Sequence, residues 1–147
     1  MTDIDSELVL VRLRLLVNYR NTLEEFRSVS LDEYLSDFRQ QLIVERLLQL
    51  MAEAATDINK NLLVQLHNIS PATSINPFLE AGRQGIITPE LAAELAQAAG
   101  MRNILVHQYK EIDSRIVFTA IQKALAQYPL YIQQITVYLD LLEEKDA

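Results

Sequence analysis

Apolar side chains recur at steps of three and four residues along most of the chain, which is the spacing of amphipathic α-helices. The first such segment runs from about Ser6 to Val29. Its apolar positions are Leu8, Val11, Leu15, Tyr19, Leu23 and Phe26, with Val9, Leu10, Leu13, Leu16 and Val17 widening the stripe. A helix that is apolar over so much of its circumference is either central in the fold or shared with a partner chain.

The middle of the chain contains a helix start, a long helical pattern and a loop. Ser30 and Glu33 have the spacing of a capping box, which marks the start of a helix. The helical period then continues without Gly or Pro from Leu31 to Ile69, so it predicts one very long helix or two that meet at a soft kink. The clearest loop is "SPATSINP", and the short helix "FLEAGRQG" follows it, with Gly85 as its stop.

Two further helix starts are predicted in the second half. Thr88 caps a helix whose first position is Pro89, and Gly100 either ends that helix or lies inside it. Asp113 is a suitable N-cap for "SRIVFTAIQKALAQ", and Tyr128-Pro129 breaks or kinks the chain before a last helix that runs to about residue 144.

The whole pattern contains no strand signal, internal repeat or linker. It predicts an all-α, up-down bundle of four main helices plus short ones. The 147 residues form one domain, 1–147, with a core of workable size.

Composition narrows the possible functions. Half of the residues are apolar, 22% are charged and none is cysteine, which describes a globular protein without disulfides or thiolate chemistry. No apolar run reaches the ~20 residues that cross a bilayer, and the acidic start lacks a signal-peptide layout, so we expect a cytoplasmic protein with no membrane contact. A net charge of −7 argues against sequence-blind nucleic-acid binding, although nine of the thirteen basic residues are Arg. Without a Gly-rich phosphate loop, we expect no cofactor and no independent ATP hydrolysis.

One segment, "MRNILVHQYKEID" at residues 101–113, concentrates polar chemistry. On a straight helix Arg102 and Tyr109 lie within about 20° of each other, and Asn103 and His107 are neighbours one turn apart. These four side chains share a polar arc of about 160° opposite the aliphatic face. Arg102 and His107 themselves are about 140° apart, so they reach one phosphate only through the length of Arg, a local distortion or a second copy of the chain.

These residue types suffice for RNA cleavage. A histidine near its ordinary pKa of ~6.5 can remove and return a proton, and an arginine can hold a phosphate and stabilise the charge of its transition state. The 2′-OH of RNA supplies an internal nucleophile, so the reaction needs no metal. The alternative from spacing alone is that the histidine is an interface or capping residue and the tyrosine an ordinary surface residue.

The segment "RNILVHQYKEID" resembles the R-x4-H-x-Y motif of the HEPN superfamily, specifically of the HepT-like toxins. Arg102, Asn103, His107 and Tyr109 all stand at the expected spacing. The approach "ATSINPFLEAGRQGIITPELAAELAQAAGMRN" is also similar, and the resemblance covers roughly residues 8–142.

The resemblance implies a homodimeric helical bundle and a metal-independent endoribonuclease that acts as a toxin, leaving a 2′,3′-cyclic phosphate and a 5′-hydroxyl. Arg102 and His107 are then catalytic, while Asn103 and Tyr109 support catalysis and contact substrate. It also implies a minimal nucleotidyltransferase antitoxin of the MntA type, which transfers AMP to Tyr109. Lys110 and Arg115 extend the basic strip, although Glu111 and Asp113 dilute it.

The sequence leaves other functions open. The runner-up function is a non-catalytic helical binding module that assists a partner nucleotidyltransferase, and a third is a dimerising scaffold. His67 is expected to face solvent or the helix dipole, and Glu53 with Asp57 is expected to form a solvated face rather than a metal site. The RNA target, tRNA or mRNA, is not determined by the sequence.

Overall fold

Six helices account for the regular structure of the computed structural model, which describes residues 6–70, 76–107 and 113–146, with backbone alone at 100–107 and 146. They are α1 (Ser6–Glu24), α2 (Leu31–Ser36), α3 (Phe38–His67), α4 (Pro77–Arg83), α5 (Pro89–His107) and α6 (Ser114–Asp146). Four are long and two are short, and the described residues contain no strand, so the predicted all-α class is confirmed.

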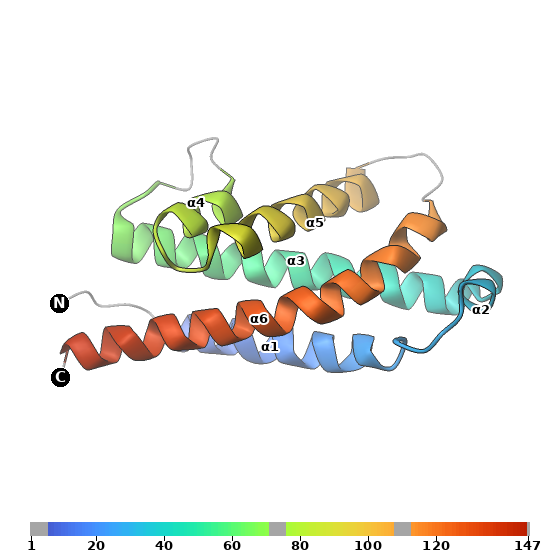
Figure 1. Cartoon of the computed structure of the whole chain (residues 1–147), viewed down its shortest axis with the longest axis horizontal. Helices are drawn as coiled ribbons and strands as arrows, with labels where there is room; N and C mark the ends of the chain where they lie inside the picture. The colour runs from blue at the N-terminus through green and yellow to red at the C-terminus, as the bar shows by residue number, and fades with distance from the viewer. Residues whose placement is uncertain (1–5, 71–75, 108–112, 147) are drawn as a thin grey trace.

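The long helices run lengthwise in layers (Figure 1). Helices α1 and α6 lie side by side, α3 packs on both, and α4 and α5 pack on α3 from the other side. The core between them holds mainly aliphatic side chains and a few tyrosines, among them Leu16, Met51, Ile58, Ile121 and Tyr131. Each fully buried side chain of this size contributes about 1.5–3 kcal/mol. No helix in the described ranges is long and apolar enough to cross a membrane.

The predicted helix over residues 31–69 divides at Asp37. Ser30 caps α2 through the expected capping box with Glu33. At Asp37 the backbone leaves the helical region (φ −119°, ψ 97°), and the carboxylate accepts hydrogen bonds from the backbone N–H groups of Arg39 and Gln40. The two helices therefore meet at a capped break, because this carboxylate satisfies N–H groups that begin α3. The first helix ends at Glu24, five residues before the predicted end.

The helix starts predicted in the second half are confirmed. Thr88 precedes α5 and its Oγ1 accepts the Leu91 N–H at 3.3 Å, while Asp113 Oδ1 accepts the backbone N–H two residues later at the start of α6. Helix α5 continues through Gly100, so this glycine lies inside the helix and does not end it. Gly85 follows α4 with φ +77°, as expected of a glycine that ends a helix.

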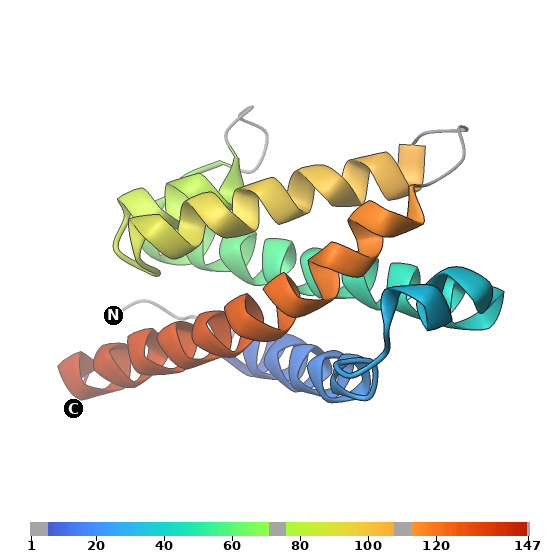
Figure 2. The same cartoon turned by 45° about the vertical axis from the view of Figure 1, so that its right-hand side comes forward.

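Pro129 does not break the last helix. Helix α6 is continuous from Ser114 to Asp146 with Pro129 inside it. A proline has no N–H to donate, so the carbonyl of Leu125 loses its intrahelical partner. The axis of α6 changes direction along its length (Figure 2), in keeping with the predicted kink rather than the predicted break.

Candidate functional site

The predicted site residues lie at the C-terminal end of α5 and just beyond it. Arg102, Asn103 and His107 belong to this helix, so the helical expectation is confirmed for the backbone up to His107. Their side chains lie outside what the structure describes, and Tyr109 lies outside the described residues altogether. With the rise of a regular helix, the backbones of Arg102 and His107 are about 7.5 Å apart along the axis.

The N-terminal half of α5 is held firmly against the rest of the molecule. Leu91, Ala92 and Leu95 are buried. The backbone N–H of Thr88 donates to Oε1 of Gln134 on α6 at 2.8 Å. The motif therefore extends from an anchored helix.

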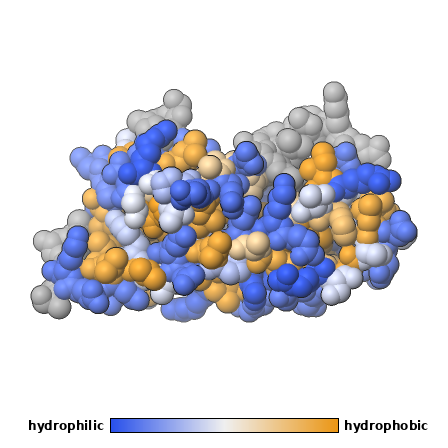
Figure 3. Space-filling model, viewed as in Figure 1, coloured by the Kyte–Doolittle hydropathy of each residue, from blue (hydrophilic) through white to orange (hydrophobic). Residues whose placement is uncertain are grey.

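The end of the molecule that carries the motif also exposes apolar side chains, seen as orange atoms at the right-hand end of Figure 3. The C-terminus of α5, the start of α6 and the α2–α3 corner all lie at this end (Figures 1 and 2). Phe38, Leu42 and Ile116 are 63%, 55% and 54% exposed. Ser114 Oγ donates to Gln41 Oε1 at 3.4 Å, which ties the start of α6 to the start of α3. We call Phe38, Leu42 and Ile116 the apolar end patch.

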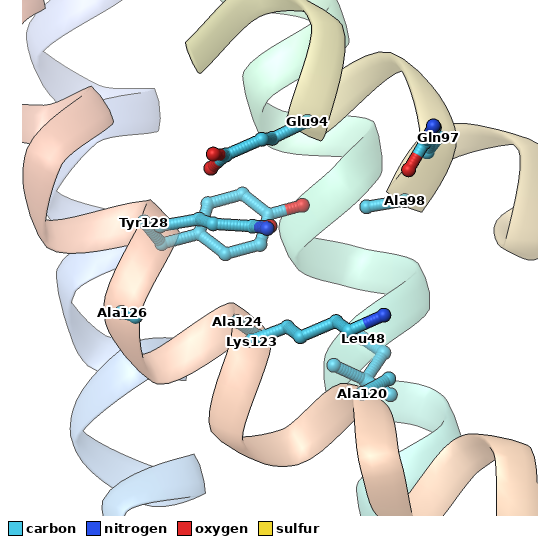
Figure 4. Close-up of a pocket in the computed structure, with 10 residues that line it drawn as sticks. Leu48, Glu94, Gln97, Ala98, Ala120, Lys123, Ala124, Ala126 and Tyr128 are labelled. Carbon is cyan, nitrogen blue, oxygen red and sulfur yellow. The ribbon is translucent and has the colours of Figure 1, made fainter. Parts of the chain in front are cut away.

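A pocket of about 490 Å³ opens beside α5, between α3 and α6 (Figure 4). It is lined by Leu48 from α3, by Glu94, Gln97 and Ala98 from α5, and by Ala120, Lys123, Ala124, Ala126, Gln127 and Tyr128 from α6. Glu94 and Lys123 extend from opposite walls, and the Tyr128 hydroxyl points toward the Ala98 side. Nothing in the sequence pattern indicated this pocket, because its walls come from three separate segments.

Two buried tyrosines of α6, Tyr128 and Tyr131, have structural roles. Burial raises the pKa of Tyr128, and burial together with the neighbouring Tyr128 raises the pKa of Tyr131 well above its ordinary value. The Tyr131 hydroxyl lies 2.6 Å from Asn59 Oδ1 and 3.1 Å from the Ala55 carbonyl oxygen. Such groups do not exchange protons near neutral pH, so neither tyrosine is an acid–base candidate.

His67 is a packing residue at the end of α3. It is half-buried, and its Nε2 lies 2.9 Å from the Tyr138 hydroxyl of α6. The two rings are stacked with centroids 6.5 Å apart. The predicted position at a helix C-terminus is confirmed, but the partner on α6 was not predicted.

The carboxylates at Glu53 and Asp57 do not build a metal site. Asp57 is exposed and lies 3.7 Å from Arg12, and Glu53 accepts from the Gln49 side chain at 3.3 Å. Within the described part of the chain, no three His, Cys, Asp or Glu side chains are grouped to hold a metal ion.

Comparison with known proteins identifies close relatives. The family model "Ribonuclease HepT-like" matches residues 15–135. The chain is 49% identical over 146 residues to the tRNA nuclease HepT of Aphanizomenon flos-aquae, covering 99% of both chains. It is 31% identical over 103 residues to the mRNA nuclease HepT of Shewanella oneidensis, covering 70% of this chain and 77% of that one.

Solved structures share the fold. The tri-AMPylated Shewanella oneidensis HEPN toxin in complex with MNT antitoxin superimposes with a TM-score of 0.79 at 25% identity, over 93% of this chain and 99% of that one. YutE of Bacillus subtilis, a cytosolic protein of unknown function, has a TM-score of 0.81 at 18% identity, over 96% and 94%, and is similar in fold alone. The resemblance read from the motif and the HEPN fold are both confirmed.

Proposed function

This chain belongs to the HepT-like ribonuclease family, and from that premise we propose that it cleaves tRNA with Arg102 and His107 as its catalytic residues. It is an endoribonuclease and the toxin of a toxin–antitoxin pair, with an MntA-type antitoxin as partner. The observation that carries the choice of tRNA is the 49% identity to a tRNA nuclease over 99% of both chains. The mRNA nuclease relative is less similar and shares a smaller part of the chain.

The proposed reaction is an internal transesterification. His107 removes the proton of a ribose 2′-OH, and the 2′ oxygen attacks the adjacent phosphorus. The bond from phosphorus to the 5′ oxygen breaks, and that oxygen takes a proton to become a 5′-hydroxyl, while the phosphate becomes 2′,3′-cyclic. Arg102 holds the phosphate oxygens and stabilises their added charge, and Asn103 orients His107 or the phosphate.

We expect the active form to be a homodimer of single domains, each spanning residues 1–147. Two observations support a dimer. Arg102 and His107 are about 140° apart around α5, so one chain presents them poorly to a single phosphate. The apolar end patch lies at the same end as the motif, where burial against a second copy would remove its apolar surface from water. In the proposed dimer, the partner's His107 is the acid that protonates the leaving oxygen.

Tyr109 is the proposed site of AMP transfer by the antitoxin. It follows His107 by two residues. An AMP group there adds bulk and negative charge beside the arginine and histidine that must receive the substrate phosphate. Modification would therefore block RNA binding by repulsion and by occupancy.

The catalytic assignment is tested with the chain's two histidines. Purified protein, free of antitoxin and shown by intact mass to carry no AMP, is incubated in EDTA with tRNA and with mRNA. His107→Ala should abolish cleavage without changing the oligomeric state. His67→Ala, the matched control, removes the only other imidazole and should retain cleavage. Absence of cleavage by the unmodified dimeric wild type would favour the alternative, a non-catalytic module that assists the nucleotidyltransferase.

The dimer surface is tested with two variants of α3. Leu42→Arg places a charge in the apolar end patch and should give a monomer, by light scattering, that no longer cleaves RNA. Val64→Arg is the control, because Val64 is also exposed on α3 but lies near its other end. A Leu42→Arg protein that remains dimeric and active would exclude this surface.

A further inference from the structure

We infer that the pocket between α3, α5 and α6 binds one RNA base that carries an exocyclic amino group, next to the cleaved phosphate. The inference rests on the proposed function, since the ligand is part of the RNA substrate. The pocket shares α5 with the proposed catalytic motif, and the lining residues within the described part of the chain all lie outside that motif.

Small side chains create the space. Ala98 of α5 and Ala120 and Ala124 of α6 lie where larger residues would close the gap between the two helices. The resulting volume of about 490 Å³ is within the ~300–1,000 Å³ typical of small-ligand sites. Leu48 from α3 adds to the apolar wall. Such walls suit the flat, weakly hydrated faces of a base.

The polar groups around this space favour a base over a phosphate. Lys123 and Glu94 place one positive and one negative charge on opposite walls. A phosphate would gain from the first and be repelled by the second. A neutral base is free of this conflict, and its ring edge can use both groups.

The same polar groups predict which bases bind. A carboxylate accepts hydrogen bonds from amino groups such as N4 of cytosine, and a glutamine amide both donates and accepts, as adenine requires. Glu94 and Gln97 on α5 supply these two chemistries. Uracil has no amino group and offers Glu94 only its ring N–H, so it should bind less well.

The position along α5 relates the pocket to the scissile bond. Ala98 precedes Arg102 by four residues, which is about 6 Å along a helix axis. Nucleotides advance about 3.4 Å each along the axis of a duplex. A base one or two nucleotides away from the phosphate at Arg102 therefore reaches the pocket.

The exposed apolar surface of α1 does not supply such a site. Leu10, Val11 and Leu15 leave exposed apolar surface on α1, but these three side chains have no hydrogen-bonding group of their own to select a ligand. The pocket combines a partly open volume, apolar walls and opposed polar groups in one place.

The first test measures binding of nucleosides alone. Cytidine, adenosine and uridine are titrated into the wild-type protein and followed by ligand-observed NMR, with inorganic phosphate as a fourth probe. Cytidine and adenosine should bind about tenfold more tightly than uridine, the lower part of the range for a well-paired base contact. Equal binding of uridine, or binding of phosphate alone, would overturn the inference.

Variants place the binding in the pocket. Ala98→Leu fills the space and should abolish nucleoside binding, while Ala93→Leu makes the same change at an exposed position of α5 outside the pocket. Glu94→Gln preserves the shape and should remove the preference for cytidine over uridine. This conservative variant keeps the test decisive if Ala98→Leu does not fold.

Cleavage kinetics separate this inference from the proposed function. With tRNA, Ala98→Leu should raise KM about tenfold and leave kcat within about twofold, since the base contact is made before and during the reaction. If the wild type binds nucleosides selectively but cleaves no RNA, the proposed function fails and the pocket stands. If the wild type cleaves and Ala98→Leu cleaves with unchanged KM, or changes the oligomeric state instead, the pocket inference fails and the function stands.

Discussion

Gly82→Ala tests how closely α4 approaches α5, the helix that carries the motif. A Cβ atom added at Gly82 would lie 2.7 Å from the Cβ of Ala92, 3.4 Å from the Cα of Pro89 and 3.8 Å from the carbonyl oxygen of Thr88. Carbon atoms pack best at about 3.5–4.0 Å, so the two helices must separate by about 1 Å. Ala92 is only 1% exposed and belongs to α5, and its methyl group has no rotatable bond that could turn it away. The clash can therefore be relieved only if the helix backbone moves.

Two opposing effects set the size of the change. Overpacking of this kind costs about 1–3 kcal/mol. Alanine is about 1 kcal/mol more favourable than glycine inside a helix, and Gly82 lies inside α4. The expected result is a loss of about 1 kcal/mol in the free energy of unfolding, or about 2–4 °C in Tm for a chain of this size.

Urea unfolding followed by circular dichroism measures this loss, and Ala92→Gly provides the partner for a double-mutant cycle. Removing the Ala92 methyl group relieves the contact, so the double variant should be more stable than the sum of the two single changes predicts, by about 1–3 kcal/mol. A Gly82→Ala protein that is about 1 kcal/mol more stable than the wild type, with no coupling to Ala92→Gly, would refute the close approach.

The same change should affect catalysis more than stability. Arg102 and His107, the proposed catalytic residues, lie on α5, and a 1 Å displacement of catalytic groups can reduce a rate by about 100-fold. RNA cleavage by Gly82→Ala, measured where the protein remains fully folded, should therefore fall, and the Ala92→Gly change should restore part of it.

Substitutions at three further positions test a hydrogen bond, a backbone conformation and the burial of a carboxyl group. Tyr131→Phe removes the hydroxyl that is hydrogen-bonded to Asn59, whose Nδ2 already has no partner within the described residues. The free energy of unfolding, measured with urea, should fall by about 1–3 kcal/mol, and an unchanged value would contradict this role. In Gly85→Ala the added Cβ meets no atom within 4 Å, but the alanine must adopt φ +77°. Backbone strain alone should therefore lower the free energy of unfolding by about 1–2 kcal/mol, and Gly85→Asn should lower it less. Burial raises the pKa of Glu45, which means that the folded state binds its proton more tightly and loses stability as pH rises through that pKa. Glu45→Gln should therefore be more stable than the wild type at pH 7, with the difference vanishing below the ordinary carboxyl pKa; a difference that grows in acid would have the wrong sign.

Local chemistry explains which features were predictable from the sequence. The helix starts at Ser30, Thr88 and Asp113 were correctly placed because a cap bonds to backbone groups only two or three residues away. The motif could also be recognised from the sequence, since Arg102, Asn103, His107 and Tyr109 fall within eight consecutive residues. The family and the all-α class followed from these local patterns.

Alternatives remained open where distant contacts outweigh local preference. At Pro129 the sequence allowed either a break or a kink, and α6 continues because Tyr128 and Tyr131 on either side of it are buried in the core. Between Leu31 and Ile69 the sequence allowed one helix or two, but it did not place the division at Asp37, since an uninterrupted apolar period does not reveal which polar residue will end one helix and begin the next.

The sequence by itself therefore determined the helices, their caps and the chemical identity of the motif, all of which depend on residues within a few positions of each other. Only the tertiary structure decided which side chains of different helices lie beside one another. The contact between Gly82 and Ala92, the bond from His67 to Tyr138 and the pocket at Ala98 each join segments far apart or on different helices. The physical reason is that helical periodicity specifies which face of a helix is apolar, whereas the neighbour of that face and the space left between them depend on how all the helices pack together.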